Sequence, residues 1–168
     1  MPVPLPAKPG MISSAIVLGI ATATILGALA FEHLGNYAPC PLCLDQRYAY
    51  YFAIPVTAAA YFLAEYDRGA LARILLALVA AAFLVNAGLG VYHAGIEWDL
   101  WEGPVACSGG VDIEWGEGGI AQQLQNVQVV RCDEPALHVL GFSLSVWNAL
   151  ISLGLAAIAA VGATQWRQ

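Results

Sequence analysis

Four long apolar stretches run through the chain, and shorter polar segments separate them. The stretches extend from Met11 to Phe31, from Tyr48 to Ala64, from Ile74 to Tyr92 and from Phe142 to Ala163. Each comes close to the roughly 17–25 residues with which an α-helix crosses about 30 Å of hydrocarbon. Backbone groups in lipid must bond within their own segment, so such stretches form helices. The pattern predicts an all-α membrane protein, a four-transmembrane-helix bundle in a single domain over residues 1–168.

The composition agrees with a membrane protein. The chain is 60% hydrophobic and 11% charged, with a mean hydropathy of +0.68, whereas soluble domains average roughly 45–50% apolar and about 25% charged residues. A transmembrane β-barrel would instead show alternating segments of about ten residues. The net charge of −6 gives no reason to expect a nucleic-acid partner, because such partners are bound by basic surfaces.

The first apolar stretch could instead be a cleaved signal peptide. Lys8 precedes it, and Ala28-Leu29-Ala30 resembles a cleavage site. The run from Met11 to Phe31 is longer than the usual apolar region of about 7–15 residues in such peptides. We therefore expect it to be retained as a span.

Positive charge predicts the orientation of the spans. Most of the basic residues fall at the termini and in the segment between the second and third spans, namely Lys8, Arg68, Arg73 and Arg167. Only Arg47 and Arg131 lie on the opposite side. Because lysine and arginine mark the cytoplasmic side, both termini are predicted to be cytoplasmic. The loops 32–47 and 94–141 then face outward, where disulfides persist.

The first outer loop carries a pair of closely spaced cysteines. Cys40 and Cys43 enclose Pro41-Leu42, and Arg47 follows four residues after Cys43. The pKa of a cysteine falls at helix N-termini, beside cations and in C-x-x-C motifs. Cys43 precedes the second span, at the positive end of that helix dipole, and Arg47 is placed to share its face. This pattern predicts a redox-active thiolate at the membrane surface.

The second outer loop carries the other two cysteines, Cys107 and Cys132. A purely structural disulfide between them would stabilise the fold by roughly 3–4 kcal/mol. A redox role would require a sulfur that a soluble dithiol can attack, and Cys107, beside Ser108-Gly109-Gly110, is predicted to be the more exposed. A zinc site made from all four cysteines needs two closely spaced pairs. The second pair is too widely spaced, so no metal is expected.

Between these cysteines, three apolar residues recur at helical spacing: Ile120, Leu124 and Val127. They predict a short helix lying on the bilayer surface.

Polar side chains within the spans suggest a ligand site, because polar groups at membrane depth are costly and tend to be functional. Tyr50 lies on the face of the second span below Arg47, and Asn86 and His93 share a face of the third. A cation, an imidazole and an apolar slot would suit a headgroup with two carbonyl oxygens, such as a quinone. Alternatively, His93 is an interfacial histidine bonded to a backbone carbonyl. For Asn148 a contact between helices is favoured.

These residues resemble the disulfide-bond formation protein B (DsbB) family of quinone reductases, which reoxidise the periplasmic thiol oxidase DsbA. The resemblance extends from the first span to the fourth. It is carried by P-C-P-L-C-L-D-Q-R from Pro39, Y-H-A-G-I-E-W from Tyr92, G-P-V-A-C from Gly103, R-C-D-E-P from Arg131 and L-G-F-S-L-S-V-W-N from Leu140. One difference is Gln46, at a position where an acidic residue often precedes the arginine.

The resemblance implies a multi-pass protein of the bacterial inner membrane. It implies that a reduced DsbA-like oxidase with a thioredoxin fold attacks Cys107 of a Cys107–Cys132 disulfide. The Cys40–Cys43 pair then reoxidises the loop cysteines, and Cys43 passes electrons to ubiquinone or menaquinone. Arg47 would hold and polarise the quinone headgroup, and His93 matches a position of the quinone site. The segment between the outer cysteines matches poorly, so the partner could be a dedicated DsbA-like protein.

Two other functions are compatible with the sequence. The chain could be a quinone-linked thiol oxidase similar to the vitamin K epoxide reductase family, although there the loop pair precedes the C-x-x-C motif. It could also be a non-enzymatic membrane protein whose disulfides hold its outer loops in place.

Overall fold

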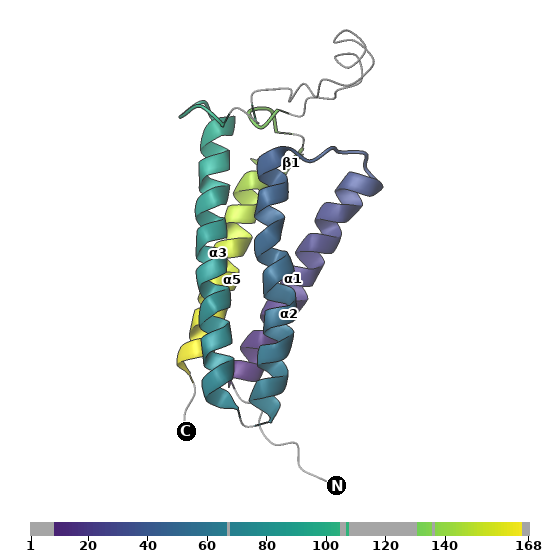
Figure 1. Ribbon diagram of the computed structural model, residues 1–168. Coiled ribbons are helices and arrows are strands. Elements are labelled where there is room, and N and C mark those ends of the chain that lie inside the picture. Colours follow the sequence, from purple (N-terminus) through teal and green to yellow (C-terminus); the bar gives the residue numbers. More distant parts are fainter. Residues whose placement is uncertain (1–8, 67, 105–106, 108–130, 136, 166–168) are drawn as a thin grey trace, which may run out of the picture.

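The computed structural model describes residues 9–66, 68–104, 107, 131–135 and 137–165 (Figure 1). Within these residues, four long helices pack side by side: α1 (Pro9–His33), α2 (Pro41–Glu65), α3 (Gly69–Glu97) and α5 (Leu144–Thr164). A short β-hairpin precedes α5. Its two strands, β1 (His138–Val139) and β2 (Phe142–Ser143), have two residues each and pair antiparallel. The predicted predominance of helix is confirmed.

Three of these helices are long and apolar enough to cross a membrane: α1, from Gly10, together with α3 and α5. Helix α2 is as long as α1, at 25 residues each. However, its first turns carry Asp45 and Arg47, and several tyrosines and a threonine follow. The prediction of a membrane protein is supported, whereas the count of four spans is not confirmed.

The first outer loop is shorter than predicted, because α2 begins before the apolar stretch does. Cys40 is the N-cap residue, and its Sγ accepts a hydrogen bond from the Cys43 backbone N–H. Pro41 occupies the first helical position, where its missing N–H costs nothing. Cys43 and Arg47 therefore lie on the first two turns of α2, and the connection from α1 is limited to residues 34–40.

The second outer loop also has different boundaries. Helix α3 continues to Glu97, and Phe142 lies in β2 instead of starting the last span. The hairpin turns at Leu140 and Gly141, both with positive φ (53° and 86°). That pair of values suits the tight turns favoured between antiparallel strands. The predicted surface helix with Ile120, Leu124 and Val127 lies outside the described residues.

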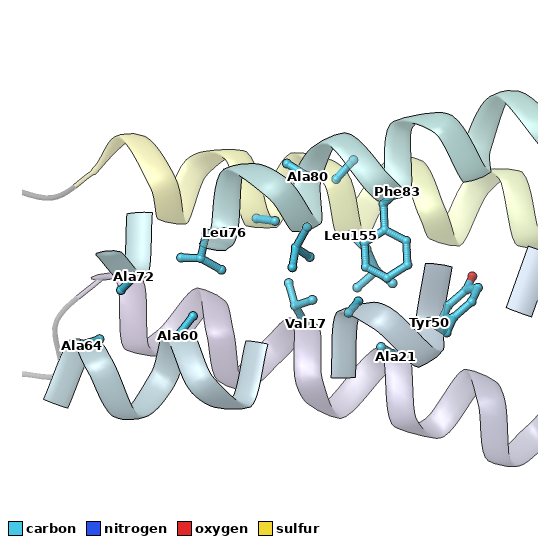
Figure 2. Packing of buried hydrophobic residues seen from close by; sticks show 14 of the residues in the cluster. Val17, Ala21, Tyr50, Ala60, Ala64, Ala72, Leu76, Ala80, Phe83 and Leu155 are labelled. Carbon is cyan, nitrogen blue, oxygen red and sulfur yellow. The ribbon is translucent and has the colours of Figure 1, made fainter. Parts of the chain in front are cut away.

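The helices pack around a core of fully buried side chains. Figure 2 shows Val17 of α1, Leu76 and Phe83 of α3 and Leu155 of α5 pointing into the space between the helices. Alanines occupy many of the remaining contacts, which lets the backbones approach closely, as is usual between membrane helices. One close approach is at Gly90 of α3, where an added Cβ would lie 3.0 Å from the backbone of Ala149.

The two ends of the bundle differ in chemistry. The N-terminal end of α1 and the C-terminal end of α5 lie at one end of the bundle, together with the connection between α2 and α3 (Figure 1). The C-x-x-C motif, the β-hairpin and the end of α3 lie at the other. Towards this second end α1 diverges from α2 (Figure 1), and the site described below lies there.

Candidate functional site

The dithiol lies at the start of α2. Cys40 and Cys43 are both free thiols in this structure; Cys40 is buried and Cys43 is half-buried. The Cys43 backbone N–H donates to Cys40 Sγ over 3.2 Å. The motif is thereby fixed by the helix cap, with one sulfur facing inward and the other partly accessible.

The two sulfurs differ in acidity. The hydrogen bond from the Cys40 thiol lowers the pKa of Cys43, and a backbone hydrogen bond at Cys40 acts in the same direction. The pKa of Cys40 is raised, because it holds the shared proton and is buried. The sequence predicted a Cys43 thiolate, and the direction agrees. The main cause is different, however: Arg47 contributes less than the neighbouring thiol, and burial and Glu97 oppose it.

His93 reaches the dithiol from α3. Its Nε2 lies 3.7 Å from Cys40 Sγ, and its Nδ1 lies 3.0 Å from the Gln46 side-chain nitrogen. Both side chains are buried. Glu97, one turn further along α3, has a carboxylate oxygen 3.7 Å from Nε2. Its other oxygen accepts a hydrogen bond of 2.6 Å from the Ser145 hydroxyl of α5. A chain of polar groups therefore connects Cys40 with the start of α5.

Arg47 is paired with a residue that the sequence argument did not single out. Its guanidinium donates to the Glu32 carboxylate of α1 over 2.5 Å. The pair bridges the two helices where they diverge, and Arg47 and Glu32 remain 12% and 28% exposed. The cation predicted for the site is present, although part of its charge is already balanced.

A cavity of about 320 Å³ lies next to these residues. Ligand pockets in proteins are typically about 300–1,000 Å³. Polar groups of Cys43, Arg47 and His93 line one part, and Tyr50 and Asn148 line another. Most of the rest is apolar, with walls from α1, the 34–40 connection and α5: Ile25, Ala28, Phe31, Tyr37, Leu144, Trp147 and Ile151.

Asn148 has one amide group without a partner. Its Oδ1 accepts hydrogen bonds from the Tyr50 hydroxyl (2.8 Å) and from Asn86 Nδ2 (3.3 Å). Both donors also contact the Ser152 hydroxyl. The predicted role between helices is therefore present. Asn148 Nδ2, however, is buried and has no hydrogen-bond partner among the residues that the structure describes, and its side chain lines the cavity. A buried unsatisfied donor costs roughly 1–3 kcal/mol, so this group is suited to an acceptor on a ligand.

The second cysteine pair forms a disulfide, Cys107–Cys132. It packs in one buried cluster with Cys40, Leu42 and Ile96. The exposed fractions of Cys107 and Cys132 are 3% and 1%. Cys107 is thus only marginally the more exposed of the two, and it is buried in this state. Attack by a soluble thiolate would require this sulfur to become accessible.

Trp101 packs back against the end of α3. Trp101 stacks on Tyr92 and donates its indole N–H to the Tyr92 carbonyl over 2.8 Å. Its ring fills the space beside Gly95, where an added Cβ would lie 2.0 Å away. A larger residue at position 95 would therefore displace the tryptophan. Gly103 lies against Cys107 and Ile96, because a Cβ added there would be 3.3 Å from each of them.

Sequence reasoning identified the four cysteines, Arg47 and His93 but missed three partners. Glu97 follows His93 by one helical turn and Gln46 follows Cys43 by three residues, and both spacings place the side chains on shared helix faces. Nothing in the sequence pairs Glu32 with Arg47, because that contact depends on the angle between α1 and α2.

Comparisons with known proteins identify the family of the chain. The family model for the disulfide bond formation protein DsbB matches residues 12–162. An uncharacterised protein of Rickettsia prowazekii (strain Madrid E) is 25% identical over 142 residues, covering 83% of this chain and 80% of the relative. The disulfide bond formation protein B of Herminiimonas arsenicoxydans is 35% identical over 88 residues, covering 51% of this chain and 53% of that protein. No solved structure matches. The chain is thus a membrane thiol oxidoreductase that belongs to the disulfide bond formation protein DsbB family.

Proposed function

We propose that this protein reoxidises a soluble, DsbA-like dithiol protein and delivers the electrons to a membrane quinone. The observation that carries the proposal is the position of the reduced Cys40–Cys43 pair. It lies between a buried disulfide on one side and an apolar cavity on the other. Electrons that enter at Cys107–Cys132 would therefore have a path through the dithiol to a ligand in the cavity.

Electrons would pass from the soluble partner to Cys40–Cys43 in two thiol–disulfide exchanges. A thiolate of the soluble partner attacks Cys107, breaks the Cys107–Cys132 bond and forms a mixed disulfide. The partner's second thiolate resolves it, so the partner leaves oxidised and the loop pair is reduced. The loop pair then reduces a Cys40–Cys43 disulfide by the same kind of exchange. The state described here, with the loop pair oxidised and Cys40 and Cys43 free, corresponds to a dithiol that is ready to be oxidised.

The residues of the cavity suit a quinone headgroup. The buried Asn148 Nδ2 offers a donor without a partner, Arg47 offers a cation, and the remaining walls are mainly apolar. A bound quinone, either ubiquinone or menaquinone, would accept two electrons and two protons. Arg47 would stabilise negative charge as it develops. His93, which contacts Cys40 and Glu97, is placed to take the thiol proton and pass it on.

The proposed function also requires one orientation of the helix bundle in the membrane. The partner must reach the disulfide from the periplasm, so the cysteine end of the bundle faces outward and the termini are cytoplasmic. Helix α2 would then be the fourth span of a protein of the bacterial inner membrane. Its polar first turns would lie at the interface, where the dithiol meets both water and lipid.

The test is anaerobic mixing of purified protein, a reduced DsbA-like protein and ubiquinone, followed by ultraviolet absorbance. We expect stoichiometric loss of quinone absorbance with oxidation of the partner. Cys43→Ser should abolish quinone reduction, whereas the matched variant Ser152→Ala, away from both sulfurs, should retain it. Thiol oxidation that proceeds equally well without quinone, or quinone loss that persists in Cys43→Ser, would contradict the proposal.

A further inference from the structure

Three potential metal-ligating atoms converge at the dithiol. The sulfurs of Cys40 and Cys43 and a ring nitrogen of His93 all lie within 4.8 Å of one another. Cys40 and His93 are buried, and Cys43 is half-buried. In the part of the chain that the structure describes, this is the one group of three or more cysteine, histidine or acidic side chains with that geometry.

The spacing fits a tetrahedral zinc site. Zinc binds sulfur at about 2.3 Å and nitrogen at about 2.0–2.1 Å, so two such ligands at a tetrahedral angle are about 3.6 Å apart. Cys40 Sγ and His93 Nε2 are 3.7 Å apart. The C-x-x-C spacing is also typical of zinc ligands, and two cysteines with one histidine form a known set with an open fourth position.

The surroundings of His93 provide the outer support that metal-binding histidines usually have. Gln46 contacts Nδ1 over 3.0 Å, which leaves Nε2 facing Cys40. A Gln amide offers both a donor and an acceptor. Rotation of this amide therefore lets its oxygen accept the proton on Nδ1, so that Nε2 presents a free lone pair. Glu97, 3.7 Å from Nε2, or a water molecule from the cavity could complete the coordination.

We propose that reduced Cys40, Cys43 and His93 form a binding site for one zinc-like divalent cation that holds the dithiol in its reduced form. Binding releases the proton that the two sulfurs share, and the two thiolates balance the charge of the cation. The same sulfurs cannot form the Cys40–Cys43 disulfide while they ligate the metal. The cation is therefore a reversible inhibitor of electron transfer, and the oxidised pair does not bind it.

A zinc site made from all four cysteines is not expected, because Cys107 and Cys132 are widely spaced in the sequence. The structure replaces the distant second pair with His93, which is 53 positions from Cys40 in the chain and comes from a different helix. The inference concerns only the dithiol, so it does not depend on the identity of the quinone or of the soluble partner.

Cobalt(II) is the probe for the site, because thiolate ligation gives it strong absorption. Titration of the anaerobically reduced full-length protein in detergent should give a thiolate-to-cobalt band that saturates at one equivalent. Zinc should abolish that band and should protect Cys43 from alkylation. Protein with an oxidised Cys40–Cys43 pair should give no band.

Variants distinguish this site from adventitious binding. His93→Ala should weaken cobalt binding by more than about tenfold, and Gln46→Leu by roughly 10–100-fold as an outer-shell change. His138→Ala, in β1, is the matched control and should bind as the parent does. Circular dichroism checks folding; if His93→Ala does not fold, Cys43→Ser tests the same site by removing a thiolate. Unchanged affinity in folded His93→Ala or in Cys43→Ser would overturn the proposal, as would the absence of any thiolate band.

Discussion

Exchanging Arg47 for glutamine separates two roles that this side chain could have. If Arg47 holds the quinone headgroup, Arg47→Gln removes a charged hydrogen bond, which is worth roughly 1.5–3 kcal/mol. Its existing pairing with Glu32 at 2.5 Å offsets part of that energy. We therefore take the lower end, about 1.5 kcal/mol, and expect the quinone KM to rise about tenfold. The stability of the fold should change little, because partly exposed ion pairs contribute about 0–1 kcal/mol.

The matched control is Glu32→Gln, which removes the same ion pair and leaves the cation in place. Because Arg47 then loses its competing partner, the quinone KM should stay the same or fall. The assay is steady-state quinone reduction at saturating reduced partner, with thermal unfolding of both variants measured alongside. Equal increases in KM for the two variants would show that Arg47 acts by connecting α1 to α2, and the ligand role would be refuted.

Three other changes test the remaining parts of the site. Cys107→Ser should abolish exchange with the soluble dithiol but spare the Cys40–Cys43 bond, as measured by trapping of mixed disulfides; oxidation of the partner at the normal rate would exclude the relay as assigned. Because its pKa is lowered, Cys43 should be alkylated rapidly at pH values below the ordinary thiol pKa of about 8.5, and the rate should fall only as the pH drops through the lowered value. Cys40, whose pKa is raised, should react only in strongly alkaline solution, and equal pH profiles for the two sulfurs would contradict the proton sharing. Asn148→Leu should raise the quinone KM by roughly 2–10-fold through loss of a neutral hydrogen bond; a similar rise in Ser152→Ala would mean that the polar cluster acts only by holding the helices.

The sequence by itself determined the class of protein and pointed to the residues for which we propose a chemical role. Long apolar runs must become helices in lipid because no water is available to their backbone groups. The C-x-x-C motif is recognisable because its local spacing creates the cap and the sulfur pair. The direction of the Cys43 pKa shift could also be predicted, because its main cause is the neighbouring Cys40 within the same C-x-x-C motif.

Only the tertiary structure decided which distant groups meet. His93 approaches Cys40 because α3 packs against α2. Glu32 and Arg47 meet where α1 diverges from α2, and their side chains bridge the two helices. The disulfide is buried in one cluster with Cys40, Leu42 and Ile96, a long-range contact that the local sequence around Cys107 does not indicate. Such contacts depend on helix packing and crossing angles, which side-chain shape sets in three dimensions. The hydrophobic pattern of the sequence therefore does not predict these contacts.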